Sequence, residues 1–187
     1  MSSKTVISDL RKIIDKVEPS TNPTEGFNTI ADYCNSVNML EVYSNIYIGN
    51  KAAAKDIDNL NSNSILNVLN CAHGEAFDSV DTNEDYYKNS NVKYCGLQMS
   101  DSVDVNAKKH FEKGADFIEN ALENNEKVLV HCFAGLSRSA TIICAFLMLK
   151  KNMNAIDALT FLRKQRPIIP NEGFLAQLAD LDNQLKQ

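Results

Sequence analysis

Residues 128–141 carry a cysteine and an arginine at a spacing that can enclose a phosphate. The segment reads Val-Leu-Val-His-Cys-Phe-Ala-Gly-Leu-Ser-Arg-Ser-Ala-Thr, so five residues separate Cys132 from Arg138. An apolar run typical of a buried strand ends at His131, and we expect a helix to begin near Ser137. The backbone N–H groups between them can converge on one anion, and the helix N-terminus adds partial positive charge.

The features that hold a phosphate dianion also favour an ionised thiol at Cys132. An ordinary cysteine has a pKa of about 8.5, and keeping it ionised at neutral pH takes about 4 kcal/mol of differential stabilisation. Arg138 supplies a forked, permanently charged donor, and Gly135 permits a tight turn. We therefore predict that Cys132 is a nucleophile and that Arg138 binds the phosphoryl group together with the backbone of Phe133, Ala134, Gly135, Leu136 and Ser137.

The pattern His-Cys-x5-Arg-Ser, which runs from His131 to Ser139, is the signature of the cysteine-dependent protein phosphatases. From about Val42 to the C-terminus the chain resembles the small dual-specificity phosphatases of that superfamily, through segments 46–50, 68–72, 115–122 and 170–178. The resemblance implies an α/β fold with a mixed, mainly parallel sheet of about five strands and helices on both faces. It also implies hydrolysis of phosphotyrosine and phosphoserine or phosphothreonine through a phosphocysteine intermediate, without a metal or other cofactor.

A phosphate ester needs a general acid to protonate its leaving oxygen. The family places an aspartate on the loop before the long helix, and that loop reads Met-Ser-Asp-Ser-Val-Asp-Val-Asn here. Asp101 matches the family position and Asp104 is the competing candidate. Either carboxylate would also be explained as a helix cap near Asn106.

Four further residues match family positions, and three of them, Ser139, Asn171 and Arg166, also have a plainer interpretation. Ser139 would stabilise the departing thiolate or simply begin a helix, and His131 would position Cys132 through a backbone hydrogen bond. Asn171 would brace the phosphate-binding loop or only cap a helix, and Arg166 would bind a second substrate phosphate or lie solvated at a helix end.

Two other features concern the loop and its surroundings. The side chains of Phe133, Ala134 and Leu136 resemble those of the mitogen-activated-protein-kinase phosphatases. Cys71 ends a predicted neighbouring strand, where it could form a reversible disulfide with Cys132.

Strand and helix patterns alternate along the chain, which predicts an α/β domain with a covered central sheet. The expected strands are the hairpin 41–49 with its turn at 44–45, then 64–71, 92–97 and 127–130. The expected helices are 3–16, a short one around 27–34, 51–60, 107–122, 140–149, and two that follow N-caps at Asn154 and Asn171. We divide the chain into an N-terminal helical extension, 1–40, that packs on a catalytic domain, 41–187.

Composition limits the classes of protein that this chain can be. It has 187 residues, of which 44% are hydrophobic and 23% charged, as in a globular domain of ordinary size. A net charge of −5 argues against binding nucleic acid or anionic membranes, and no apolar run approaches the ~20 residues of a membrane span. Five cysteines without zinc-ligand spacing, and no secretory signal, predict a cytoplasmic or nuclear protein.

The expected partners are phosphoproteins, mitogen-activated protein kinases among them, bound by a monomer or weak homodimer. Three alternatives stay open. A phosphoinositide phosphatase would usually carry lysines inside the loop, and none lies between Cys132 and Arg138. An RNA 5′-phosphatase would be more basic. A non-catalytic phosphoprotein-binding module usually lacks the nucleophile, which is present here.

Overall fold

A five-stranded mixed sheet forms the centre of the computed structural model, which describes residues 3–19 and 29–186. The strand order is β1-β2-β5-β3-β4. The first two strands form an antiparallel hairpin, and the other neighbouring pairs are parallel. The strands are β1 (Met39–Tyr43), β2 (Ile46–Gly49), β3 (Ile65–Asn70), β4 (Lys93–Gly96) and β5 (Lys127–His131).

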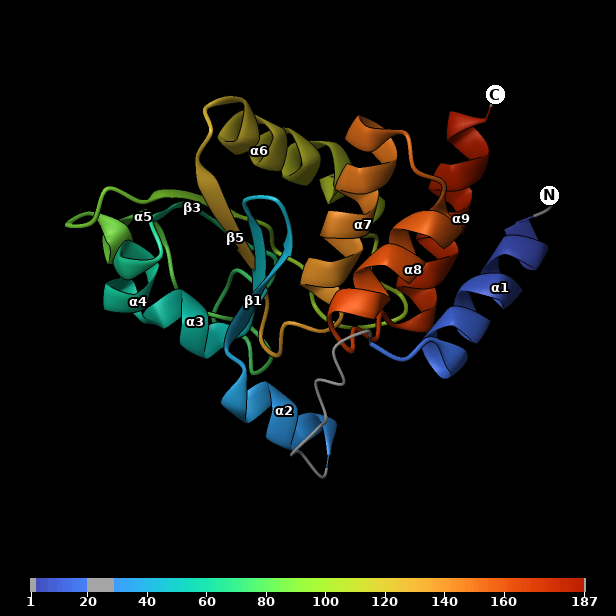
Figure 1. Cartoon of the computed structure of the whole chain (residues 1–187), viewed down its shortest axis with the longest axis horizontal. Coiled ribbons are helices and arrows are strands. Elements are labelled where there is room, and N and C mark those ends of the chain that lie inside the picture. Colours follow the sequence, from blue (N-terminus) through green and yellow to red (C-terminus); the bar gives the residue numbers. More distant parts are fainter. Residues whose placement is uncertain (1–2, 20–28, 187) are drawn as a thin grey trace.

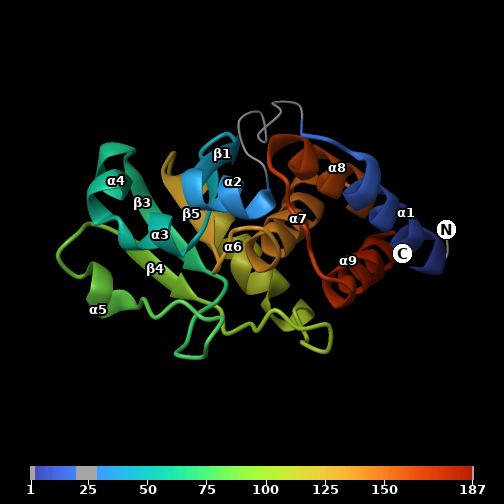
Figure 2. The same cartoon turned by 90° about the horizontal axis from the view of Figure 1, so that it is seen from below.

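Helices cover both faces of this sheet, as Figures 1 and 2 show. Alternate side chains of β5 enter different cores: Val128 and Val130 belong to the larger core, and Leu129 to the smaller one. The larger core lies under α6 (Phe111–Glu123) and α7 (Arg138–Lys151). The smaller core lies under α3 (Lys51–Lys55), α4 (Ile57–Ser62) and α5 (Glu84–Tyr87). The predicted fold class is therefore confirmed.

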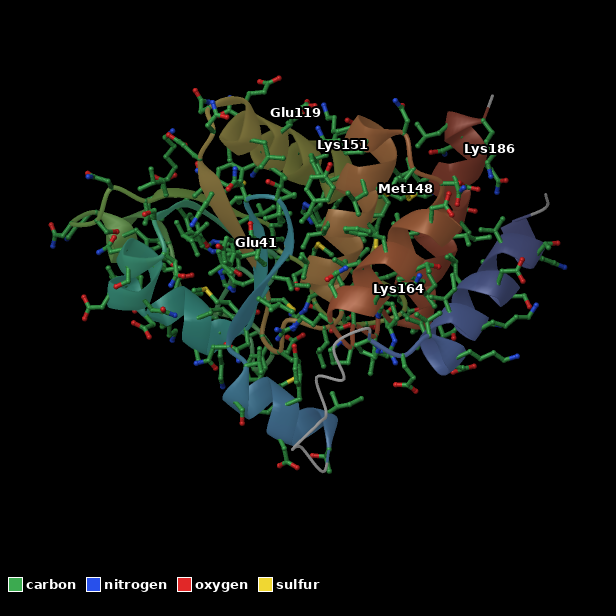
Figure 3. All side chains as sticks on the ribbon, in the orientation of Figure 1. Glu41, Glu119, Met148, Lys151, Lys164 and Lys186 are labelled. Atoms are coloured by element: carbon green, nitrogen blue, oxygen red, sulfur yellow. The ribbon has the colours of Figure 1, made fainter. Side chains whose placement is uncertain are left out.

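The central helix of the larger layer is α7, which is buried almost all round. It packs against α6, α8 (Ala155–Gln165) and α9 (Glu172–Leu185), and its residues from Arg138 to Met148 are all buried. Figure 3 shows the side chains that fill this layer, with Met148 among them. A helix enclosed on all sides needs apolar residues on all sides, which explains why residues 140–149 are apolar except for Thr141.

The N-terminal helices lie against the rest of the chain. Helix α1 (Ser3–Lys16) packs on α8 and α9 through the buried Val6 and Leu10 (Figure 1). Helix α2 (Ile30–Ser36) buries Tyr33. The expected start of this second helix near Phe27 lies outside the described residues.

Side-chain caps account for most of the helix starts in the part of the chain that the structure describes. The predicted N-caps are confirmed, because Asn154 accepts a hydrogen bond from Asp157 N and Asn171 accepts one from Phe174 N. The single helix expected at 51–60 is wrong, since Asp56 accepts from Asn59 N and begins a second helix there.

Two short helical elements also differ from the sequence-based expectation. Helix α5, capped by Asn83, was not expected, and the helix expected from 107 begins as the 3-10 turn Lys108–His110. Among the described helices, none combines the length and the apolar character that a bilayer crossing requires.

Candidate active site

The phosphate loop, residues 132–138, joins the end of β5 to the start of α7. Strand β5 lies between β2 and β3, so the loop leaves the carboxyl edge of a parallel sheet, where ligands of α/β proteins bind. Three backbone hydrogen bonds fix it: Cys132 N donates to Gly49 O, Lys51 N to Phe133 O, and Ile169 N to Leu136 O. The loop is therefore held from two sides before any ligand binds.

Gly135 is the one position of this loop where a side chain is excluded. Its φ of +73° is in the left-handed region, and a Cβ there would lie 2.5 Å from Gly49 O. The turn that results directs the N–H of Gly135 at Cys132 Sγ, 3.2 Å away. The tight turn that the sequence predicts at Gly135 is therefore present, and it directs one amide of the loop at the sulfur.

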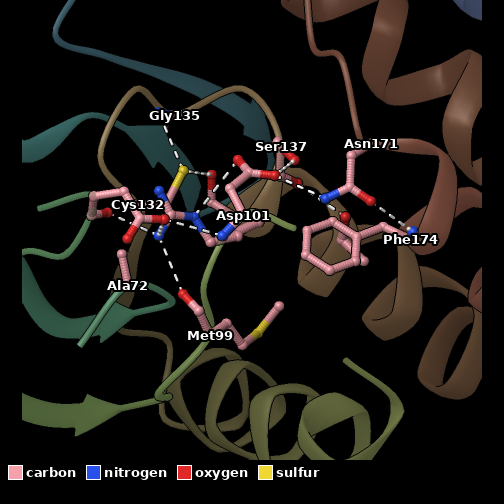
Figure 4. Close-up of polar contacts among 12 residues, drawn as sticks. Ala72, Met99, Asp101, Cys132, Gly135, Ser137, Asn171 and Phe174 are labelled. Carbon is pink, nitrogen blue, oxygen red and sulfur yellow. Dashed lines mark hydrogen bonds and ion pairs between the residues drawn. The ribbon is translucent and has the colours of Figure 1, made fainter. Parts of the chain in front are cut away.

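The thiol of Cys132 lies at the base of the cradle and is 1% exposed. Figure 4 shows its sulfur beside Gly135, and the Ser139 hydroxyl lies 3.4 Å from it. Burial alone raises the pKa of Cys132, but the charge of Arg138 and the hydrogen bonds from Ser139 and Gly135 outweigh it and leave the pKa below its ordinary value. The structure therefore favours the thiolate.

The Arg138 guanidinium is buried and is held along one edge. Its Nη1 donates to Asp78 O at 2.8 Å and to Met99 O at 3.1 Å, and it forms an ion pair with Asp78 Oδ2 at 3.2 Å. Its Nε is buried with no hydrogen-bond partner among the described residues. A buried donor without a partner is costly, and an anion in the cradle would satisfy it.

Asp101 faces this centre from the acid loop, residues 99–106. Its Oδ1 accepts hydrogen bonds from Ser137 Oγ and Asn171 Nδ2, both at 2.8 Å, and its Oδ2 lies 3.6 Å from Arg138 Nε (Figure 4). Asp104 lies on the same loop but is exposed and has no hydrogen bond to the phosphate loop. Of the two candidates, only Asp101 reaches the cradle.

Asn171 supports the acid loop rather than contacting the phosphate loop directly. Its Oδ1 caps α9, and its Nδ2 donates to Asp101, which in turn accepts from Ser137. From the sequence, Asn171 could brace the phosphate-binding loop or only cap a helix. In the structure it caps α9 and also holds the Asp101 carboxylate.

His131 precedes Cys132 in the chain and is fully buried. Its Nδ1 lies 3.4 Å from Cys132 O, and its Nε2 has no hydrogen-bond partner among the described residues. Burial lowers the pKa of His131 to about 4, an effect that Arg138 reinforces, so the ring is neutral at pH 7. This position suits support of the Cys132 backbone, as expected from the sequence.

The expectation for Arg166 requires correction. This residue is 0% exposed, and each guanidinium nitrogen donates to the protein: Nε to Gly135 O, Nη1 to the Tyr33 hydroxyl and Nη2 to Val37 O. The guanidinium also stacks over the Tyr33 ring. Arg166 therefore ties the phosphate loop to α2, and in this structure it is neither solvated nor free to bind a second substrate phosphate.

Asp78 was missed by the sequence reasoning. Besides binding Arg138, its Oδ2 accepts the backbone N–H of Asp101 at 3.0 Å, so one carboxylate aligns both groups. Asp78 lies in a connection without a recognisable motif. Its only sequence signal is an acidic residue shortly after a buried strand.

Cys71 lies next to the site and is buried, and its N–H donates to His131 O. Burial raises the pKa of Cys71 far above its ordinary value, and the nearby Cys132 raises it further. A disulfide with Cys132 stays a prediction. No group of three or more histidine, cysteine or acidic side chains among residues 3–19 and 29–186 is arranged to hold a metal ion.

A thiol with a lowered pKa at the end of a central parallel strand, contacted by the Gly135 amide and close to a buried arginine, is the arrangement of the cysteine-dependent phosphatases. Residues 46–184 match the family model for the dual specificity phosphatase catalytic domain, so the chain belongs to that family.

Solved structures agree on the fold. Human DUSP28 aligns with a TM-score of 0.71 and 21% identity, over 81% of this chain and 97% of that one. DUSP15 aligns with a TM-score of 0.66 and 31% identity, over 80% and 96%. PTPMT1 in complex with PI(5)P aligns with a TM-score of 0.68 and 19% identity, over 80% and 97%. Helices α1 and α2 lie outside the range that the family model matches.

Proposed function

We propose that this cysteine phosphatase is a dual-specificity protein phosphatase, which removes phosphate from phosphotyrosine and from phosphoserine or phosphothreonine. The observation that carries the proposal is the state of Cys132: a thiol with a lowered pKa, contacted by Gly135 N–H and the Ser139 hydroxyl, next to a buried arginine. These groups fit a phosphoryl group that is attacked by sulfur.

In the first step the Cys132 thiolate attacks phosphorus, so that the sulfur–phosphorus bond forms as the bond to the leaving oxygen breaks. The loop amides and Arg138 stabilise the charge on the three equatorial oxygens. Asp101 gives its proton to the departing oxygen, and its contacts with Ser137 and Asn171 fix the direction of transfer.

In the second step water attacks the phosphocysteine, and Asp101, now a carboxylate, accepts the proton. The Cys132 sulfur leaves as a thiolate. The Ser139 hydroxyl, 3.4 Å away, can donate a hydrogen bond to it, which lowers the barrier to its departure. The two proposed steps use water and the side chains named above, without a metal or other cofactor.

Protein substrates are favoured over lipids and RNA by charge. The chain carries a net charge of −5, and no lysine or arginine lies between Cys132 and Arg138 to bind a second phosphate. We extend the proposal to phosphoprotein substrates that include mitogen-activated protein kinases, acted on by a monomer or weak homodimer in the cytoplasm or nucleus. Phe133, Ala134 and Leu136 support it through their resemblance to the phosphatases of those kinases.

The test is phosphate release from matched phosphotyrosine and phosphothreonine peptides, from PI(5)P in vesicles and from a 5′-triphosphorylated RNA. We expect turnover of both peptides and none by Cys132→Ser. Turnover of the lipid or the RNA alone would contradict the proposal, and peptide binding without turnover would make the protein a binding module. Asp101→Ala should still bind substrate but hydrolyse it slowly. This variant can therefore be used to capture the physiological substrate from lysate.

A further inference from the structure

Some of the exposed large apolar side chains lie on loops that form the candidate active site. Among the described residues there are six: Ile30, Phe77, Tyr86, Val103, Ile169 and Leu185. Three of them, Phe77, Val103 and Ile169, are 99%, 54% and 38% exposed and belong to three separate loops. We call these three residues the apolar rim.

Each loop that carries a rim residue also holds part of the catalytic centre. Phe77 precedes Asp78, whose carbonyl and carboxylate bind Arg138. Val103 lies on the acid loop, two residues after Asp101. The Ile169 N–H donates to Leu136 O of the phosphate loop at 2.8 Å. Exposed apolar side chains are thus fixed, through the backbone, at the border of the cradle.

A cavity of about 400 Å³ adjoins the rim on one side. The acid loop, the segment before α9 and helix α1 enclose it, and its apolar lining comes from Ile14, Val103, Ile169, Pro170 and Leu175. Asn171, which binds Asp101, lies in its wall. The cavity is therefore one residue away from the proposed general acid.

Helix α1 gives this cavity a wall that the family domain does not supply, because the family model begins at residue 46. The wall is held in place, since α1 packs on α8 and α9 and Arg11 donates to Glu172 across the cavity border at 2.6 Å. That ion pair is exposed and adds little stability, but it pairs Arg11, the only basic side chain among the described residues that line the cavity.

Charge decides what kind of molecule would contact this surface. Asp15 and Glu172 line the cavity, and Asp78 and Asp104 flank the rim residues in sequence. Anionic lipid surfaces attract proteins through clustered lysines and arginines, whereas Arg11 is the single basic residue among the described residues that line this cavity. An uncharged, apolar segment of a polypeptide matches the lining better.

We propose that the apolar rim and its cavity bind an apolar side chain that lies a few residues from the phosphorylated residue of a protein substrate. The proposal rests on the proposed protein phosphatase function and adds a sequence preference to it. An extended peptide advances about 3.3 Å per residue, so a side chain two or three positions from the phosphorylated residue extends roughly 7 to 10 Å along the peptide, toward the loops that border the cradle. Burial of one such side chain corresponds to a preference of roughly 10- to 100-fold in kcat/KM.

The experiment compares phosphotyrosine peptides that carry leucine, glycine or aspartate at each of the three positions on either side of the phosphotyrosine. A small aryl phosphate, which has no flanking residues, reports the chemistry alone. We expect one or two positions at which leucine raises kcat/KM roughly 10-fold or more over glycine, with aspartate below glycine. Absence of a leucine preference at every position, with normal aryl phosphate turnover, would overturn this inference and leave the proposed function intact.

Variants then locate the preference. The ratio of kcat/KM for the leucine peptide to that for the glycine peptide should fall in each of four variants: Phe77→Ser, Val103→Ser, Ile169→Ser and, on α1, Ile14→Ser. Two controls should retain this ratio, because their exposed side chains lie on α5 and at the end of α9 and do not line the cavity: Tyr86→Ser and Leu185→Ser. Thermal unfolding of each variant checks that it folds. A ratio that all rim variants retain would contradict the inference. So would loss of activity on PI(5)P vesicles with an unchanged peptide ratio, which would make the rim a membrane contact.

Discussion

Asn171 and Asp101 are joined by a hydrogen bond of 2.8 Å that runs from the asparagine amide to the carboxylate oxygen Oδ1. The other end of the same amide accepts the Phe174 N–H and begins α9. One side chain therefore fixes a helix start and the direction of the proposed general acid. Because Ser137 donates to the same carboxylate oxygen, the acid loop, the phosphate loop and α9 meet at Asp101.

Loss of the hydrogen bond between Asn171 and Asp101 should lower kcat by more than the accompanying loss of stability explains. Asn171→Ala deletes a cap, which costs about 1 kcal/mol of unfolding free energy, and also frees the Asp101 carboxylate. We expect kcat to fall roughly 10- to 100-fold, since small displacements of a reacting group have effects of that size. Steady-state kinetics and urea unfolding measure the two quantities.

Asn154→Ala is the matched control. Asn154 caps α8 with the same geometry and donates to Asp157, away from the site. It should lose a similar free energy of unfolding and keep its kcat. Equal kcat values for the two variants would show that the contact with Asp101 has no role in the reaction.

The identity of the general acid is tested by the two aspartates of one loop. Asp101→Asn should lower kcat by about 10²- to 10³-fold on esters with poor leaving groups, and less on esters whose leaving group needs no proton. Asp104→Asn should leave both rates unchanged, because Asp104 is exposed and makes no hydrogen bond to the phosphate loop. A collapse of the rate with Asp104→Asn, and none with Asp101→Asn, would reverse the assignment.

Ser139 should influence both the thiolate and the second chemical step. Its hydroxyl is among the groups that lower the pKa of Cys132, so Ser139→Ala should move the half-maximal pH for iodoacetate alkylation upwards. The wild-type midpoint should lie below that of a free cysteine, because a lowered pKa keeps the thiolate at lower pH. Loss of the contact should also slow phosphocysteine hydrolysis, which a burst of phenol release before steady turnover would reveal.

A midpoint that does not move in Ser139→Ala would show that the serine only begins α7. A matched comparison is Thr141→Ala. Thr141 is equally buried in the first turn of α7, but its hydroxyl donates to Ser137 O and not to the sulfur. This variant should leave both the alkylation midpoint and the burst unchanged.

The local parts of the site could be predicted from the sequence, and the tertiary parts could not. The phosphate loop lies within one short segment, and strand, glycine and arginine all follow from the nearby residue types. The same holds for the N-caps Asn154 and Asn171, whose hydrogen bonds span three residues.

Arg166 and Asp78 show where such reasoning ends. Tyr33, 133 positions away in the chain, covers Arg166, and no local pattern announces that helix α2 will pack there. Asp78 contacts Arg138 across 60 positions from a connection that resembles an ordinary polar turn. In both cases the partner is decided by how the elements pack.

His131 makes the stability of the fold depend on pH in a direction that can be derived. Its ring is buried, and burial lowers its pKa from an ordinary 6.5 to about 4. The unfolded chain therefore binds a proton at this residue between pH 6.5 and pH 4, and the folded chain does not. Stability rises with pH wherever the unfolded state binds more protons, so it must fall as the pH decreases through this window.

The His131 contribution should amount to about 3 kcal/mol across the window, most of it above pH 5, where carboxylates are still largely ionised. Urea unfolding at pH 7, 6 and 5 measures it, and His131→Asn, which keeps a donor for Cys132 O but does not titrate, should flatten the slope. A ring resonance of His131 that titrates near pH 6.5 in the folded wild type would contradict the argument directly. That measurement needs no variant, so it stands even if His131→Asn fails to fold.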